Sequence, residues 1–250
     1  MYLQRSILVF ITGLLMLAAS PVYAFQPQDR MEALIAHFDK KGIDIQSSLD
    51  DDRFGIIENI KGKFTRAAEV KIEGLDDYKR VLNYEKKKND LPEFLSTYAD
   101  ELADAEQKYD IPQHVIAAII GIESGFGLHK GKYNPFNVYV SMYVKNHRSK
   151  FALAQLEELL IFSKKHNLDV MALKSSYAGA MAYAQFVPWS LNRWFVGKDL
   201  YDMPTNIYSV ANFLAHYKDV TGTVEKAIYR YNPSTLYQQV VLALADEVSD

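Results

Sequence analysis

Apolar residues recur along the chain at helical spacing, and one stretch is apolar on every side. Residues 111–127 carry no charge between positions 115 and 122. A helix of that composition has no polar face to turn toward water, so we expect it to be buried. Asp110 as a capping residue and Pro112 in the first turn predict where this helix begins. Gly125 predicts where it ends.

Amphipathic patterns with a period near 3.6 residues predict further helices. These patterns lie at residues 29–41, 91–110, 151–166, 208–217, 224–230 and 236–248. In the second of them, Pro92 fits the first helical turn. Residues 54–72 and the aromatic-rich run 138–144 fit either helix or extended chain, and the strand signal is weak throughout. Because no repeat occurs at a period of about 20–50 residues, the pattern predicts a mainly α fold in one compact body.

The first 24 residues have the pattern of a cleaved signal peptide. Arg5 is followed by an apolar run from residue 7 to 19, and Val22 and Ala24 fit the small-residue positions before a cleavage site. The alternative is an uncleaved membrane anchor, because the apolar run is near the lower length limit for spanning a bilayer. We expect export to the periplasm, with residues 1–24 removed.

Composition narrows the possible functions. The chain has no cysteine, which excludes disulfides, thiol catalysis, thiolate metal sites and a lipid-bearing cysteine, so we expect no lipoprotein. Without Arg5 the exported chain has 27 basic and 31 acidic residues, a net charge of −4, and its basic residues are scattered. Nucleic-acid binding requires a concentrated basic face, so we expect no nucleic-acid partner. We expect a monomer.

One acid, Glu123, lies in the last turn of the predicted buried helix. Partial burial and the negative end of the helix dipole both disfavour its charged form. A carboxyl group in that environment can act as a general acid near neutral pH. The structural alternative is less favoured, because an unpaired acid at the end of an apolar helix is costly unless it has a function.

Two further segments contain residues that suit a binding site. In residues 175–190, SSYAGAMAYAQFVPWS, small residues allow close backbone approach, and Gln185 places an amide on an apolar stretch. A buried amide must find partners, so Gln185 fits either a substrate contact or a bond to a neighbouring helix end. Near the carboxyl end, Tyr231, Asn232 and Pro233 fit either a site or a simple helix stop.

Taken together and in order, these segments resemble a known family. A glutamate in I-E-S at the end of a buried helix, the segment G-A-M-x-Y-x-Q-F and a later Y-N resemble the lytic transglycosylases of bacterial cell walls. The resemblance is closest to the membrane-bound lytic transglycosylase B group, which has a lysozyme-like catalytic domain. It is clear over residues 92–233 and fainter upstream. It implies a lysozyme-like transglycosylase domain at 91–250, with a helical amino-terminal segment at 25–90 packed on it.

The resemblance also implies a reaction. The family cleaves peptidoglycan glycan strands during murein turnover, without water as the nucleophile. Glu123 would protonate the oxygen between N-acetylmuramic acid (MurNAc) and N-acetylglucosamine (GlcNAc), and would then act as base on the muramoyl 6-hydroxyl to close a 1,6-anhydro ring. Ordinary glycosidases use two carboxylates about 5 Å or about 6.5–9.5 Å apart. No second acid accompanies Glu123 in the motifs, which suits a one-acid mechanism.

The remaining site residues follow from the same resemblance. Gln185 would bond substrate, Tyr231 and Asn232 would hold Glu123 or the sugar, and Ser176 would stand near the reacting centre. Aromatic character adds candidates for sugar stacking, which are Tyr133, Tyr183 and Phe186. With 17 tyrosines and 13 phenylalanines in the chain, the alternative for each of these is core packing.

This chain departs from the family pattern at several positions. Ala182 and Ala184 replace the usual glycines, and Trp189 replaces a small polar residue. Extra methyl groups beside the cleft would narrow it, and Trp189 would add a platform or close a subsite. Asp199 and Asp202 supply too few oxygen ligands for the calcium loop common in the group, so we expect no metal and no cofactor.

Two other functions remain open at this stage. One is a catalytically weak peptidoglycan-binding or cell-envelope scaffold protein of the same fold, for which an assembly partner would be expected. The other is a conventional muramidase hydrolase, which would need a second carboxylate across the cleft. The intact Glu123, Gln185 and Tyr231–Asn232 favour the transglycosylase.

Overall fold

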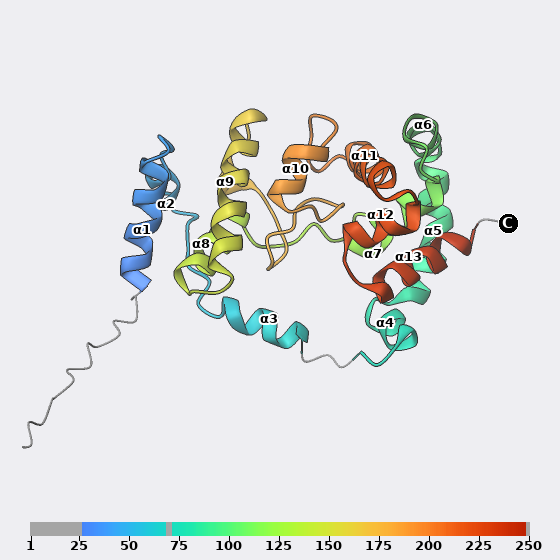
Figure 1. Cartoon of the computed structure of the whole chain (residues 1–250), viewed down its shortest axis with the longest axis horizontal. Helices are drawn as coiled ribbons and strands as arrows, with labels where there is room; N and C mark the ends of the chain where they lie inside the picture. Colours follow the sequence, from blue (N-terminus) through green and yellow to red (C-terminus); the bar gives the residue numbers. More distant parts are fainter. Residues whose placement is uncertain (1–26, 69–71, 249–250) are drawn as a thin grey trace, which may run out of the picture.

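The computed structural model describes residues 27–68 and 72–248, so the predicted signal peptide lies outside the described part (Figure 1). Within these ranges the chain forms thirteen α-helices and one short 3-10 helix, and its β structure is limited to isolated bridges. The prediction of a mainly α fold is confirmed. None of the described helices is long and apolar enough to cross a membrane.

The first six helices wrap the body from one end to the other (Figure 1). They are α1 (Pro27–Asp39), α2 (Gln46–Leu49), α3 (Ile60–Ala68), α4 (Leu75–Val81), α5 (Tyr84–Thr97) and α6 (Ala99–Tyr109). Helices α1 and α3 pack on α8 (Pro135–Val144), whereas α5 and α6 pack on α7 (Gln113–Ser124). In Figure 1, α3 runs along the lower side of the molecule between these two ends.

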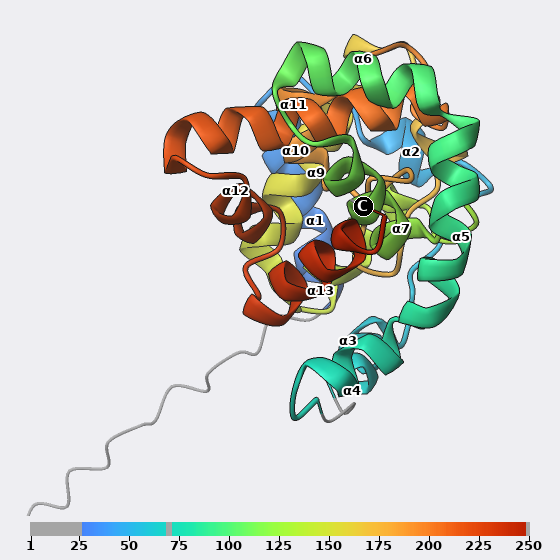
Figure 2. The same ribbon diagram turned by 90° about the vertical axis from the view of Figure 1, so that its right-hand side faces the viewer.

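The predicted buried helix is α7, which lies at the centre of one half of the molecule. It packs against α5, α6, α11 (Met203–Thr221) and α13 (Thr235–Asp246), which surround it in Figure 2. Every residue from 115 to 122 is buried. An apolar helix enclosed on all sides has no water-facing surface to satisfy, which is why no polar stripe is needed.

The two ends of α7 differ in how well the sequence predicted them. Gly125 ends the helix with φ 60°, and its N–H donates to the Gly121 carbonyl oxygen at 2.9 Å, as predicted. The prediction that Asp110 caps the start of α7 was wrong. Asp110 instead ends α6 in a left-handed conformation with φ 53°, and its carboxylate is paired with Lys218.

The helix predicted at residues 91–110 is two helices. The first, α5, already begins at Tyr84, because Glu85 and the three lysines at 86–88 are good helix formers. Pro92 is therefore inside a helix and not in its first turn. Helix α5 ends at Thr97, and only Tyr98 lies between it and the first residue of α6. Helix α5 also runs across residues 90 and 91, where the sequence predicted a domain boundary.

The rest of the chain completes the body around α7. It contains α8, α9 (Ser149–Lys165), a 3-10 turn (Val170–Ala172), α10 (Pro188–Trp194), α11, α12 (Val224–Tyr231) and α13. The ambiguous run 138–144 is helical, because Asn134 caps α8 by accepting a hydrogen bond from the Asn137 N–H at 3.1 Å. Between the 3-10 turn and α10 the chain is irregular. Isolated bridges join Tyr133 to Ser175, Ser175 to Met181 and Met181 to Phe186.

Candidate active site

Glu123 occupies the last turn of α7, where the apolar core meets the surface. Its side chain is partly exposed, but the surrounding groups remove most of the water from the carboxyl group. This burial raises the pKa of Glu123 to about 7, although a hydrogen bond from Tyr237 acts in the opposite direction. The Tyr237 hydroxyl donates to Glu123 Oε1 at 2.7 Å. Near neutral pH the group can therefore either donate or accept a proton.

Tyrosines from three different helices lie around this carboxyl group. Burial and the nearby charge of Glu123 raise the pKa values of Tyr78 on α4, Tyr231 on α12 and Tyr237 on α13. These phenols therefore stay neutral. The rings of Tyr231 and Tyr237 are stacked with their centroids 6.5 Å apart. Among the described residues Glu123 has no ion-pair partner, and no second carboxylate contributes to its pKa shift.

Tyr237 is the site residue that the sequence reasoning missed. The helix predicted at residues 236–248 was given no site residue. Tyr237, Val240, Val241 and Leu244 share the spacing of one helical face, and all four are buried, whereas Leu236 is partly exposed. A tyrosine at the head of that face was the available signal.

The segment 175–186, which we call the wall segment, contains the second motif. Its first turn is closed by Ser176, whose hydroxyl oxygen accepts from the Ala180 N–H at 3.2 Å and whose own N–H donates to the Ala180 carbonyl oxygen at 2.8 Å. The Tyr139 hydroxyl donates to the Gly179 carbonyl oxygen at 2.8 Å. Gly179 has φ 85°, and a Cβ there would lie 2.2 Å from the Tyr139 ring. Only glycine fits at this position.

The second turn of the wall segment holds Gln185. Ala182 and Gln185 both have positive φ, 60° and 49°. Gln185 Nε2 donates to the Ala182 carbonyl oxygen at 2.7 Å, so one amide N–H is used within the turn. Ala182 and Ala184 are each 1% exposed. The expectation that their methyl groups narrow a cleft was wrong, because both are packed inside the protein.

The wall segment is attached to the helices behind it by polar contacts. Asn206 Oδ1 on α11 accepts from the N–H groups of Tyr183 and Ala184 at 3.1 and 3.0 Å. The Tyr231 hydroxyl donates to the Ala184 carbonyl oxygen at 2.5 Å. Tyr231 therefore positions the wall segment, whereas the hydroxyl that reaches Glu123 belongs to Tyr237.

The other residues named from the sequence have different surroundings. Phe186 is 4% exposed and packs against the rings of both Phe213 and Tyr231, as core packing would place it. Tyr183 is partly exposed and close to Gly127, four residues beyond Glu123. Asn232 ends α12 through its backbone and forms no hydrogen bond with Glu123.

Tyr133 and the acids near α11 can be placed as well. Tyr133 is partly exposed, and a hydrogen bond with Lys63 lowers its pKa. Asp202 caps α11, and Asp199 accepts from the Tyr201 N–H. In the described ranges, no group of three or more His, Asp or Glu side chains lies close enough to hold a metal ion. The absence of a metal stays a prediction.

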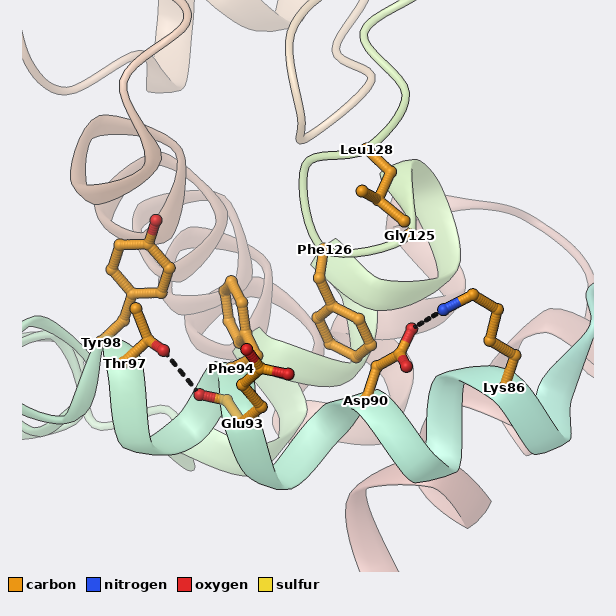
Figure 3. Close-up of a pocket in the computed structure, with 9 residues that line it drawn as sticks. All are labelled: Lys86, Asp90, Glu93, Phe94, Thr97, Tyr98, Gly125, Phe126 and Leu128. Atoms are coloured by element: carbon orange, nitrogen blue, oxygen red, sulfur yellow. Dashed lines mark hydrogen bonds and ion pairs between the residues drawn. The ribbon is translucent and has the colours of Figure 1, made fainter.

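A pocket of about 300 Å³ lies between α5 and the turn after α7 (Figure 3). It reaches Gly125 but does not include Glu123. Its lysine and one of its acids, Lys86 and Asp90, pair with each other at 2.5 Å. Because Glu123 does not line this pocket, we assign the pocket no part in the chemistry.

Comparison with known proteins adds sequence relatives. Residues 30–224 match the family described as transglycosylase SLT domain. The chain is 32% identical over 136 residues to membrane-bound lytic murein transglycosylase B of Escherichia coli (strain K12), a match that covers 52% of this chain and 38% of that protein. The match thus spans less than half the length of this curated relative.

Solved structures share the fold. Soluble lytic transglycosylase SltB1 from Pseudomonas aeruginosa superimposes with a TM-score of 0.79 at 21% identity, over 87% of this chain and 97% of that chain. SltB3 from the same organism, in complex with NAG-NAM-pentapeptide, gives a TM-score of 0.76 at 18% identity, over 89% and 79% of the two chains. The lysozyme-like fold predicted from the sequence is confirmed.

Proposed function

Because the chain belongs to the transglycosylase SLT domain family, we propose that it is an exported peptidoglycan lytic transglycosylase. Its reaction is cleavage of the MurNAc–GlcNAc bond with formation of 1,6-anhydromuramoyl ends. The observation that carries this proposal is the environment of Glu123. A single carboxyl group with a pKa of about 7 accepts a hydrogen bond from Tyr237, without a cation or a second carboxylate among the described residues around it.

In the first half of the reaction Glu123 acts as an acid. Its proton passes to the oxygen that joins MurNAc to GlcNAc, the bond from that oxygen to the MurNAc C1 breaks, and GlcNAc leaves as an alcohol. Positive charge develops at C1 while Glu123 becomes a carboxylate. Burial favours the protonated starting form.

In the second half the same group acts as a base. The Glu123 carboxylate takes the proton of the MurNAc C6 hydroxyl while that oxygen bonds to C1, which closes the 1,6-anhydro ring and returns the proton to Glu123. The Tyr237 hydroxyl stabilises the carboxylate between the two steps, because a hydrogen bond to the charged form favours it. No water molecule is consumed.

We propose that the wall segment and the end of α12 bind the glycan strand. Gln185 uses one N–H inside its own turn, which leaves its amide oxygen and second N–H for a sugar. Ser176, Tyr183 and Asn232 are partly exposed, as substrate contacts need to be. Phe186 and Tyr231 serve behind them as supports.

Location and organisation form part of the same proposal. Residues 1–24 direct the chain to the periplasm and are removed. We propose that residues 25–90 are an amino-terminal segment of the transglycosylase domain at 91–250. Helix α5, which begins at Tyr84, crosses from the one into the other as one continuous helix. The protein acts as a monomer and needs no cofactor.

The test is digestion of purified peptidoglycan by the mature protein and by Glu123→Gln, with product analysis by mass spectrometry. Glutamine keeps the shape of the side chain and can still accept the Tyr237 hydrogen bond, but it cannot transfer the proton. We expect anhydromuropeptides from the wild type and none from the variant. Reducing-end sugars would instead indicate a hydrolase. Binding without release would support the alternative, a peptidoglycan-binding scaffold.

A further inference from the structure

A small aromatic pocket lies beside Gln185 and Tyr231, between α10, α11 and α12. Its volume is about 150 Å³, and Trp189, Tyr217 and Arg230 contribute to its walls. Pockets that enclose a whole small ligand measure roughly 300–1,000 Å³. A pocket of this size next to an extended binding surface suits one unit of a longer ligand.

Trp189 is an exposed side chain held in a fixed orientation. It is 37% exposed, and the Arg193 guanidinium lies over its ring at 4.1 Å from the centroid. Arg193 is itself fixed, because its Nη1 donates to the Trp189 carbonyl oxygen at 2.8 Å and to Glu158 Oε1 at 3.1 Å. The Trp194 ring meets the indole edge-on at 5.1 Å. An apolar ring that is both exposed and immobilised is prepared for binding, since little side-chain entropy remains to be lost.

Arg230 supplies the pocket's cationic group. It lies in the last turn of α12 and is exposed. Arg193 is neutralised by Glu158, whereas Arg230 forms no ion pair within the described part of the chain. A guanidinium without an internal partner can bind a carboxylate through two parallel hydrogen bonds.

These two features point to one kind of ligand. The face of an aromatic ring suits the C–H face of a sugar, and a free guanidinium suits a carboxylate. A muramoyl unit that carries its stem peptide offers both, because the peptide is attached to the sugar and bears free carboxylates. We propose that this pocket is a subsite for a peptide-bearing muramoyl unit, with Trp189 against the sugar and Arg230 on a stem-peptide carboxylate. The inference rests on the proposed function, since it names part of the same substrate.

The experiment measures binding in the Glu123→Gln background, where turnover cannot interfere. The ligands are a GlcNAc-MurNAc disaccharide with a tetrapeptide stem and the same disaccharide without the peptide, and affinity is read by calorimetry. We expect Arg230→Gln to weaken binding of the peptide-bearing ligand about tenfold, the value of one charge-assisted contact. Binding of the peptide-free ligand should change less than about twofold. Trp189→Ala should weaken binding of both ligands.

Lys226→Gln is the matched control, because it removes one positive charge from the same helix one turn earlier and lies outside the pocket. It should leave both affinities unchanged. Intrinsic fluorescence gives a second readout, since the chain has two tryptophans and Trp194 is only 5% exposed. The peptide-bearing ligand should alter Trp189 emission.

The subsite would be overturned if Arg230→Gln weakened binding of both ligands equally, or if the Glu123→Gln protein bound neither ligand. Failure of the subsite and failure of the proposed function are distinguishable. Anhydromuropeptide release by the wild type without a selective Arg230 effect rejects only the subsite. Selective binding without anhydromuropeptide release rejects only the reaction.

Discussion

Glu123 and the wall segment belong to the same proposed site, but one lies in a regular helix and the other has no regular secondary structure. Glu123 belongs to a regular helix, and its raised pKa follows from the apolar core around that helix. The wall segment has no regular structure, and positive φ angles and side-chain caps hold it in place. The difference shows that burial in the apolar core raises the pKa of Glu123, whereas local backbone geometry determines the shape of the wall segment. Changes to each region should therefore have different signatures.

The largest effect is expected in the wall segment, from Gly179→Ala. The new Cβ would lie 2.2 Å from the Tyr139 ring, so the variant should lose about 3 kcal/mol or more of unfolding free energy in denaturant titrations. Gly222→Ala is the matched control, because it has φ 89° with no atom within 4 Å. It should lose only about 1 kcal/mol. Equal losses would mean that backbone strain, and not the contact with Tyr139, requires the glycine.

Glu123→Gln should change how stability depends on pH. The folded protein binds a proton up to about pH 7, whereas the unfolded chain releases it near pH 4.5, so wild-type stability falls as pH rises between these values. Glutamine removes that loss. Unfolding at pH 8 should show the variant more stable than the wild type by about 2 kcal/mol, after allowance for solvent screening.

Below the unfolded-state pKa of Glu123 this difference should vanish, because both the folded and unfolded chains then carry the proton. If the difference in stability did not change with pH, the pKa of Glu123 would be the same in the folded and unfolded chains, and burial would not raise it.

Tyr237→Phe should have an intermediate effect. It removes the hydrogen bond to Glu123 Oε1, at a cost of about 1–2 kcal/mol in stability, and the pKa of Glu123 should rise above 7. The pH at which activity declines on the alkaline side should rise with it. Tyr84→Phe removes a similar hydrogen bond, to Glu247 at 3.0 Å, and should leave the pH profile unchanged.

The smallest effect is expected from Ala182→Gly. Glycine relieves the positive φ at this position but loses a buried methyl group, so stability should change by less than about 1 kcal/mol. Because the methyl group is packed inside the protein, kcat/KM should change less than about twofold. A many-fold increase in kcat/KM would show that Ala182 narrows the binding surface after all.

The features of α7 that depend only on the residues within and next to that helix could be predicted from the sequence. The uncharged run before Glu123 and the glycine after it determine a buried helix and its end, and both were confirmed. Asp110 was misassigned because a residue between two helices can cap the second or end the first, and its pairing with Lys218 joins residues 108 positions apart.

The wall segment could not be predicted in the same way. Nothing in the residue types of Ala182 and Gln185 indicates a positive φ, which the surrounding contacts impose. Tyr237 was missed for a related reason. Its contact with Glu123 spans 114 residues, so only the packing of α13 on α7 brings the two together.

The central claim is that burial raises the pKa of the single carboxyl group of the site, that of Glu123, to about 7. The most direct measurement is a carbon-13 NMR titration of the glutamate side-chain carboxyl groups, with the Glu123 signal identified by its loss in Glu123→Gln. We expect a midpoint near pH 7 for Glu123, well above the midpoints of Glu157 and Glu247. Hydrogen bonds with Lys41 and other partners lower the pKa of Glu157, and hydrogen bonds with Lys88 and other partners lower that of Glu247. A Glu123 midpoint near 4.5 would contradict the account, because the group would then be an ordinary surface carboxylate and not an acid at neutral pH.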